Sequence, residues 1–313
     1  MKAIKPKKLQ KGDLIGLISP ASTLDDPSRL ENGVRYLERL GYKVEVGKNV
    51  GKCNGYLAGT DKERTDDLHS MFSNKKVKAV FCIRGGYGSA RLLDKIDYRI
   101  IKNHPKIFVG YSDISSLQLA FFFKTGLISF AGPMVGVDFH EDVNPFTEEM
   151  FWKLITSSKK FGRINSPDDE NILSLSPGST TGRIIGGNLS VISALIGTEY
   201  FPDLKDKILL IEETGEMPYR VDRMFNQLKL AKMFQGIRGI VIGSFSDCQE
   251  TDPNKKTLTL GEVITNYLSS LKKPVVYNFK HGHLRGNITV PMGATIRLNA
   301  SRKFMEISES VVS

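Results

Sequence analysis

The first third of the chain alternates short apolar runs with longer segments of helical spacing. Leu14–Ile18 is a continuous apolar run, as expected for a parallel strand that is covered on both faces. Asp26 and Pro27 begin a predicted helix, with Asp26 as N-cap and Pro27 in the first turn, and this helix ends near Gly41. Lys43–Val46 follows as the second strand, so the chain starts with a strand–helix–strand unit.

The same alternation continues to about residue 160. The sequence from Thr60 to Glu63 has the form of a capping box, which predicts the start of another helix. Further strands are expected at 77–83 and 106–110, and further helices at 89–96, 114–124 and 147–158. Repeated strand–helix alternation favours right-handed crossovers and a parallel, doubly wound α/β sheet.

The second half is more mixed, and a polar stretch rich in proline, glycine and serine precedes it. This stretch, 165–181, is predicted to be a linker between an N-terminal domain of residues 1–165 and a C-terminal domain of residues 166–313. Beyond it, strands are expected at 207–211, 237–242, 274–277, 288–290, 295–298 and 304–307, and an amphipathic helix at 220–234. The apolar positions of this helix are interpreted as core.

The composition is that of a globular protein and points to no nucleic-acid partner. Of 313 residues, 40% are hydrophobic and 25% charged, which is enough for a sizeable core and for two domains. The net charge is +10, but the lysines are scattered, and no helix-turn-helix, zinc-finger or aromatic RNA-binding motif is present. We therefore interpret the excess positive charge as solvated surface.

The cysteines and the apolar segments bear on the cellular compartment. Cys53, Cys82 and Cys248 are far apart and never in a CxxC, so neither a disulfide framework nor a cysteine zinc site is expected. The basic N-terminus is interrupted by Asp13 before an apolar stretch too short for a signal peptide. The longest apolar region, 117–137, contains charge, glycine and proline, which argues against a membrane span. We expect a cytoplasmic protein without a membrane partner.

Two polar segments follow predicted strands of the first half, where open parallel sheets bind ligands. One is Arg84-Gly-Gly-Tyr-Gly88. Its glycines permit positive φ angles and close approach of the backbone, so that free amides can hold an oxyanion or a carboxylate. The segment lacks the ending of a P-loop and the spacing of a dinucleotide-binding loop. A plain turn is the alternative interpretation.

The other segment, 110–115, places Ser112 at a predicted strand-to-helix turn. Such a turn exposes a hydroxyl while the following amide faces the same space, which suits a nucleophile of acyl transfer. The alternative is that Ser112 is only the N-cap of the helix that follows. The G-x-S-x-G pattern of esterases is absent because position 114 is Ile.

A serine nucleophile needs a base, and the base needs an orienting acid. His281 and His283 flank a glycine in a loop of the second half, and two histidines at this spacing without a third ligand are a weak metal signal. Glu212 and Glu213 follow the apolar run 207–211 directly. The residues alone leave open which glutamate and which histidine would act together.

Taken in chain order, these segments resemble the LD-carboxypeptidase family of serine peptidases. The most specific similarities are Gly-Tyr-Ser-Asp at 110–113 and the histidine segment that begins with Gly-His at 282–283. All segments similar to the family pattern are 11–21, 82–88, 109–115, 182–197, 209–216 and 282–293. The resemblance runs from about residue 7 to about residue 298.

The resemblance implies roles for these residues. Ser112 would be the nucleophile, His283 the general base and Glu212 the residue that orients it. The amide of Asp113 would form the oxyanion hole together with one from the glycine turn, preferably that of Gly86. The implied fold is a doubly wound N-terminal domain with a smaller, β-rich C-terminal domain. The resemblance implies no metal or other cofactor, and a homodimer.

The implied reaction is hydrolysis of the L,D bond that releases terminal D-Ala from murein tetrapeptide, in peptidoglycan recycling. From charge alone, Arg84 and Arg220 are candidates for contact with this small peptide, and Tyr87 of the glycine turn is a third. A second branch of the family hydrolyses microcin-like peptidyl nucleotides, and that activity is the first alternative. The second is a non-catalytic α/β protein that binds a small molecule, in which Ser112 would be inert.

Overall fold

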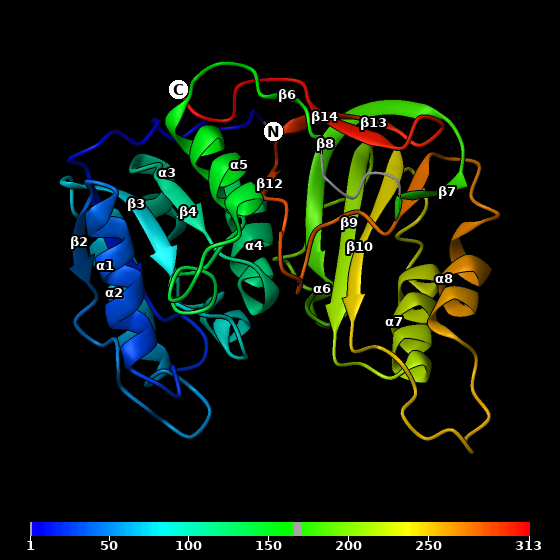
Figure 1. The fold of residues 1–313 in the computed structure, drawn as a ribbon, viewed down its shortest axis with the longest axis horizontal. Helices are drawn as coiled ribbons and strands as arrows, with labels where there is room; N and C mark the ends of the chain where they lie inside the picture. The colour runs from blue at the N-terminus through cyan, green and yellow to red at the C-terminus, as the bar shows by residue number, and fades with distance from the viewer. Residues whose placement is uncertain (1, 166–170) are drawn as a thin grey trace. The chain divides into compact units, whose positions relative to one another are not determined.

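The computed structural model describes residues 2–165 and 171–313 and divides into two compact units (Figure 1). The N-terminal unit comprises the chain up to Lys159 together with Thr289–Gly293 and Ser310–Ser313, and the C-terminal unit comprises Lys160–Ile288 and Ala294–Glu309. The predicted linker falls partly on residues 166–170, which lie outside the described residues.

The N-terminal unit is built on a mainly parallel sheet. Within the described residues, six strands form it in the order β12-β5-β4-β3-β1-β2. The strands are β1 (Leu14–Ile18), β2 (Lys43–Val46), β3 (Val77–Cys82), β4 (Ile107–Val109), β5 (Ser129–Ala131) and β12 (Val290–Met292). Strands β1 to β5 run parallel, and β12 lies antiparallel to β5. The chain winds outward from β1 to β2 and then the other way through β3, β4 and β5, which confirms the doubly wound prediction.

Helices cover both faces of this sheet. They are α1 (Ser28–Arg39), α2 (Asp61–Ser73), α3 (Tyr98–Asn103), α4 (Ser115–Thr125) and α5 (Pro145–Thr156). Val80 of β3 pairs with Phe108 of β4, so the next residue, Phe81, points to the opposite face. Phe108 packs against rings of α2 and α4, whereas Phe81 packs against Phe151 and Trp152 of α5. The buried runs in the strands therefore face helices on both sides.

Local signals fix some helix starts but not all. Thr60 and Glu63 form the predicted capping box, in which each side chain accepts a bond from the other residue's backbone amide. The helix expected at 89–96 is only a 3₁₀ turn, Ser89–Leu92. The amide and the hydroxyl of Ser89, its first residue, bond to Asp113.

The C-terminal unit contains a larger sheet. Among the described residues, eight strands take the order β6-β14-β13-β8-β9-β10-β11-β7, and β8 to β11 are parallel. The strands are β6 (Gly162–Arg163), β7 (Leu173–Ser176), β8 (Ser179–Asn188), β9 (Lys207–Thr214), β10 (Gly239–Ser246), β11 (Val275–Tyr277), β13 (Thr295–Asn299) and β14 (Phe304–Ile307). The helices are α6 (Leu189–Leu195), α7 (Pro218–Leu230) and α8 (Leu260–Leu268). The expected α/β class with a β-rich second half is confirmed.

Two segments differ from the sequence prediction. The later part of the predicted linker belongs to the sheet, because β7 ends at Ser176 and β8 begins at Ser179. Its threonines are β-branched, and Thr180 and Thr181 pair with β13, which a composition argument does not detect. The strand expected at 288–290 is β12, and it belongs to the sheet of the N-terminal unit. The predicted single division at 165/166 does not include the two late segments, Thr289–Gly293 and Ser310–Ser313, that belong to the N-terminal unit.

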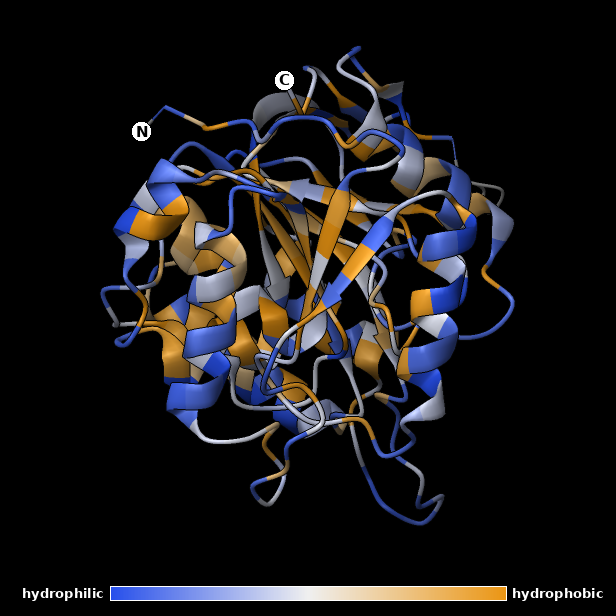
Figure 2. Ribbon diagram, turned by 90° about the vertical axis from the view of Figure 1, so that its left-hand side faces the viewer, coloured by the Kyte–Doolittle hydropathy of each residue, from blue (hydrophilic) through white to orange (hydrophobic). Residues whose placement is uncertain are grey.

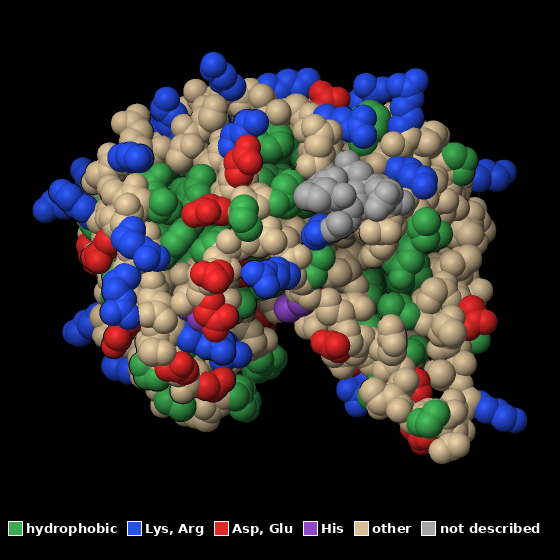
Figure 3. All heavy atoms as spheres, viewed as in Figure 1, with side chains coloured by type: hydrophobic (Ala, Val, Ile, Leu, Met, Phe, Trp, Pro, Cys, Tyr) green, Lys and Arg blue, Asp and Glu red, His purple; other side chains and the backbone are tan. Residues whose placement is uncertain are grey.

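Hydropathy follows this architecture. Figure 2 shows apolar residues along the strands and polar residues on the outward sides of helices. Lys and Arg side chains are spread over the face seen in Figure 3 and do not form one patch, in agreement with a scattered net charge of +10. In the part of the chain that the structure describes, no helix has the length and apolar character needed to cross a membrane.

Candidate active site

Ser112 adopts a backbone conformation that a non-glycine residue rarely takes. It follows β4 and precedes α4, and its φ angle is 63°, in the left-handed region. This conformation costs an L-residue about 1–2 kcal/mol and is typical of functional sites. Ser112 is partly exposed while Tyr111 and Asp113 beside it are buried. The N-cap position of α4 is occupied by Ile114, so Ser112 is not the N-cap of that helix.

The glycine turn lies against this serine. A Cβ at Gly85 would lie 3.0 Å from Ser112 Cβ and 3.2 Å from its Oγ, so a larger residue there would push against Ser112. Gly86 has a φ angle of 103°. Within the described residues, the backbone amides of Gly86 and Asp113 donate to no other group. Two free backbone donors therefore lie in the segments that meet at Ser112, as stabilisation of an oxyanion requires.

The Asp113 side chain ties the glycine turn to the nucleophile segment. Its buried carboxylate accepts a bond from the Ser89 amide at 2.8 Å, and the Ser89 hydroxyl donates to the Asp113 carbonyl at 2.6 Å. Burial raises the pKa of Asp113, and the hydrogen bonds from Ser89 and the amide of Gly88 oppose that shift. Ser89 directly follows the turn, so these bonds hold its last residues next to Ser112.

In the C-terminal unit, Glu212 and His283 form a close pair. Glu212 Oε2 lies 2.8 Å from His283 Nδ1. The Glu212 side chain is 1% exposed and that of His283 is 23% exposed, so the pair has a buried acid and an accessible imidazole. Strand β9 was expected to end at Ile211 but continues to Thr214, which places Glu212 inside the sheet. A carboxylate on Nδ1 favours the tautomer that carries its proton there, so Nε2 is the acceptor nitrogen of the ring.

The neighbouring candidates have other partners. Glu213 points to the opposite side of β9, where its carboxylate accepts bonds from Asn188 Nδ2 and from the amide and hydroxyl of Ser190 at the start of α6. Burial raises the pKa of Glu213, and these hydrogen bonds oppose the shift. The His281 ring is buried, and its Nδ1 lies 2.7 Å from the Ile288 carbonyl. Burial lowers the pKa of His281.

The loop that carries His283 is shaped by close contacts of its own backbone. The amide of Gly282 donates to Asn287 Oδ1 at 3.1 Å, and the His281 carbonyl accepts a bond from the Ser244 amide at 2.8 Å. The Ser246 hydroxyl donates to the His283 carbonyl at 2.5 Å. Sequence reasoning missed Ser246, because the predicted strand ended at 242 and a serine beyond it carries no signal of such a contact.

The three residues expected to contact the substrate are placed as follows. Arg84 donates through Nη1 to the Thr23 carbonyl at 2.9 Å and to Asp25 Oδ2 at 3.2 Å. Tyr87 is 54% exposed. Arg220 lies in α7 and forms an ion pair with Glu216 at 3.3 Å. Contact of these side chains with a substrate stays a prediction. Among the described residues, no group of three or more His, Cys, Asp or Glu side chains has the arrangement of a metal site.

Comparison with known proteins decides the family. The model of the LD-carboxypeptidase N-terminal domain matches residues 15–132, and that of the C-terminal domain matches residues 181–298. The chain belongs to the LD-carboxypeptidase family. It is therefore an enzyme, a hydrolase of the serine carboxypeptidase type, and the resemblance found in the sequence is confirmed.

Relatives of this LD-carboxypeptidase carry two kinds of name. A Bacillus subtilis (strain 168) protein named "Probable murein peptide carboxypeptidase" is 40% identical over 309 residues, which are 98% of this chain and 95% of that protein. The Escherichia coli microcin C7 self-immunity protein MccF is 30% identical over 331 residues, which cover 96% and 95%.

Solved structures of both kinds of relative resemble this chain. A structure of MccF in complex with aspartyl sulfamoyl adenosine has a TM-score of 0.91 at 30% identity and covers 99% of this chain and 100% of that one. The crystal structure of muramoyltetrapeptide carboxypeptidase from Oxalobacter formigenes has a TM-score of 0.82 at 28% identity, covering 94% and 97%.

Proposed function

We propose that this enzyme removes the terminal D-Ala from murein tetrapeptide by hydrolysing the bond between an L-centre and D-Ala. The observation that carries this proposal is the buried contact of 2.8 Å between Glu212 Oε2 and His283 Nδ1, which is the acid–base half of a serine peptidase triad. The strained Ser112 supplies a candidate nucleophile. The names of the Bacillus and Oxalobacter relatives support the choice of a murein peptide as substrate.

The proposed reaction proceeds by acyl transfer. His283 Nε2 takes the proton of Ser112 Oγ as that oxygen attacks the carbonyl carbon of the L-centre, and Glu212 holds the imidazole orientation and stabilises the imidazolium. The amides of Asp113 and Gly86 stabilise the tetrahedral oxyanion, at about 3 kcal/mol per donor. The proton then passes from His283 to the leaving amine of D-Ala, and the carbon–nitrogen bond breaks.

A water molecule completes the cycle. His283 accepts a proton from this water, whose oxygen attacks the acyl-serine, and Ser112 leaves with the proton that His283 returns. The mechanism requires Ser112 Oγ and His283 Nε2 to come within hydrogen-bond reach in the working enzyme.

The substrate carries at least one carboxylate, at its D-Ala end, and cationic side chains would bind it. Arg84 and Arg220 are our candidates, because both present guanidinium groups that are partly exposed, at 29% and 51% of the side chain. We propose Tyr87 as an apolar contact for the same substrate. We further propose that the enzyme acts in the cytoplasm, as a homodimer, in peptidoglycan recycling.

Mass spectrometry of murein tetrapeptide incubated with the enzyme tests this function. The wild type should release D-Ala, and Ser112→Ala should release none above background, since removal of a triad nucleophile lowers kcat by roughly 10⁶-fold. Release by both proteins would exclude Ser112 as nucleophile. Release by neither would contradict the murein reaction.

A second candidate activity is hydrolysis of a peptidyl or aminoacyl nucleotide. The observation that favours it is the TM-score of 0.91 to MccF, which binds aspartyl sulfamoyl adenosine in the solved complex. The same triad would attack the acyl carbonyl, and the leaving group would be the sulfamoyl nitrogen in place of D-Ala. Incubation with aspartyl sulfamoyl adenosine distinguishes the two, because release of aspartate would show this activity directly.

A further inference from the structure

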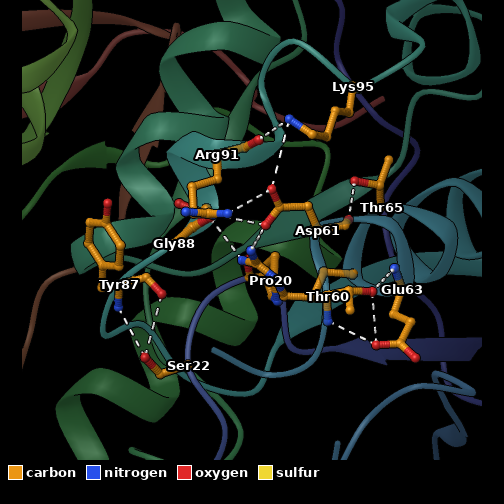
Figure 4. Close-up of polar contacts among 12 residues, drawn as sticks. Pro20, Ser22, Thr60, Asp61, Glu63, Thr65, Tyr87, Gly88, Arg91 and Lys95 are labelled. Carbon is orange, nitrogen blue, oxygen red and sulfur yellow. Dashed lines mark hydrogen bonds and ion pairs between the residues drawn. The ribbon is translucent and has the colours of Figure 1, made fainter. Parts of the chain in front are cut away.

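Arg64 of α2 is a buried cation outside the proposed triad and oxyanion hole. Its side chain is fully buried, although it lies in a helix whose sequence is rich in charge. The Nη1 atom donates to two carbonyls, that of Pro20 at 2.5 Å and that of Gly88 at 2.8 Å, and Nη2 donates to Asp61 Oδ1 at 2.6 Å. Figure 4 labels Pro20, Asp61 and Gly88, the three residues that this guanidinium binds.

Gly88 is held through both its backbone carbonyl and its backbone amide. Arg64 binds its carbonyl, while its amide faces the Asp113 carboxylate and lowers the pKa of that group. A side chain at Gly88 would be strained at its φ angle of 121°, and a Cβ would lie 2.4 Å from Leu57 and 2.9 Å from Arg64 Nη1, so these side chains would have to move. The end of the glycine turn is therefore fixed between a buried arginine and a buried aspartate.

The other end of the turn is fixed to the segment after β1. The amide of Ser22 donates to the Gly85 carbonyl at 3.2 Å, and the Tyr87 amide donates to Ser22 Oγ at 3.2 Å (Figure 4). Since Arg64 also binds the Pro20 carbonyl, one guanidinium joins this segment to the turn. The turn is thus held at Gly85, which lies against Ser112, and at Gly88.

We propose that Arg64 is a positioning residue for the oxyanion hole. Its guanidinium holds the glycine turn at the place where the Gly86 amide and Ser112 act on the same carbonyl group. This inference rests on the proposed function, because it assigns the turn a part in that reaction.

Burial supports a positioning role over a purely stabilising one. Removing a guanidinium from water carries a large desolvation cost, and buried ion pairs are often replaceable by apolar residues without loss of stability. Arg64 is buried despite that cost, and its Nε has no hydrogen-bond partner among the described residues. Its planar fork reaches two carbonyls and a carboxylate together, which a lysine ammonium with a different geometry does not reproduce.

The test compares Arg64→Lys with Arg91→Lys. Arg91 binds the same Asp61, at 2.9 and 3.2 Å, but it is exposed and does not contact the turn through this bond. Arg64→Lys should lower kcat about 10- to 100-fold, as expected for a misplaced catalytic backbone. It should leave KM within about twofold, and Arg91→Lys should leave both constants within about twofold.

A second measurement separates positioning from a loss of structure. In a Ser112→Ala background, the dissociation constant of the tetrapeptide should be the same with and without the Arg64→Lys substitution, and circular dichroism should show a folded protein in both cases. An unchanged kcat overturns the proposal, as does a loss of activity that follows only from a lower melting temperature. If Arg64→Lys does not fold, Arg64→Gln, which keeps a planar donor, is measured in its place and should lower kcat in the same way; an unchanged kcat would again overturn the proposal.

Labelling of Ser112 by a fluorophosphonate keeps this inference separate from the substrate. If the wild type labels but releases no D-Ala, the murein reaction is contradicted while positioning is still measured by the labelling rate. That rate should fall in Arg64→Lys and not in Arg91→Lys. Equal rates in the two variants, or no labelling of the wild type, would overturn the role of Arg64.

Discussion

The backbone of Gly282 packs directly on the carboxylate of Glu212. A Cβ at position 282 would lie 2.8 Å from Glu212 Oε2, the oxygen that contacts His283, and the φ angle of Gly282 is 124°. The glycine before the histidine thus gives the acid its room, and it lets the loop turn in a way that a larger residue does not allow.

Gly282→Ala is expected to lower kcat/KM about 100-fold, because the added methyl group displaces the oxygen that orients the imidazole. Gly261→Ala is the matched control in the same unit, since a Cβ there meets nothing within 4 Å and the residue lies inside α8. Steady-state kinetics of D-Ala release check both. Equal activity of the two variants would contradict the contact.

Glu212→Gln should lower kcat by about 10⁴-fold with the fold intact, as in serine peptidases whose orienting acid is made an amide. Glu213→Gln should instead affect stability, by about 1–3 kcal/mol, since it disturbs the bonds to Asn188 and Ser190 and leaves the pair with His283 in place. Kinetics and urea unfolding of both variants measure the difference. A larger kinetic effect at Glu213 would reverse our assignment of the acid.

The backbone strain at Ser112 should lower the free energy of unfolding. Ser112→Ala keeps a Cβ at a φ angle of 63°, whereas Ser112→Gly removes it, so the glycine variant should be more stable than the alanine variant by about 1 kcal/mol. Both should be inactive. Urea unfolding of the two inactive proteins gives the comparison free of any effect of the hydroxyl. Equal stability would show that the turn stores no strain.

Lys106 predicts a dependence of stability on pH. Its Nζ donates to the carbonyls of Met71 and Asn74 at the end of α2, and burial, with a smaller contribution from Lys78, lowers its pKa to about 8. Between pH 8 and the unfolded value near 10.5, the unfolded state binds more protons, so this residue's contribution to stability rises with pH.

The measurement is the free energy of unfolding of the wild type and of Lys106→Met across a range of about pH 7.5 to 10.5. The free energy of unfolding of the wild type should rise relative to that of Lys106→Met as pH rises. The contributions of other titrating groups are the same in both proteins and cancel in the difference. Lys43→Met is the control at an exposed lysine, in β2 of the same unit. A difference that does not change with pH would contradict the lowered pKa.

The parallel core of the fold is readable from the sequence because its signals are local. Strands β1 and β2 have the predicted bounds, and the capping box at Thr60 forms as expected. Continuous apolar runs and side-chain capping depend on neighbours within a few residues, so they survive in the folded chain. The strand β12 was misplaced because its position depends on pairing with β5, which is far away in sequence.

From the residues alone the site was readable in type but not in register, and the family resemblance supplied Glu212 and His283, which the structure pairs. Glu212 and Glu213 are adjacent on one strand and therefore face opposite sides, and only the packing of β9 shows which side holds the histidine. Arg64 gave no signal at all, since a cation in a charged helix normally lies in water. Its burial follows from tertiary contacts with backbone carbonyls, which side-chain patterns do not encode.

The strand β12 also has a consequence for how the chain folds during translation. Domains that are synthesised first usually fold first, but the sheet around Ser112 keeps β5 as an open edge until residues 290–292 leave the ribosome. By then Glu212 and His283 have already been made. The half that carries the proposed nucleophile is thus completed only after the proposed acid and base exist. A chain released early would expose an unpaired strand edge open to association with other chains.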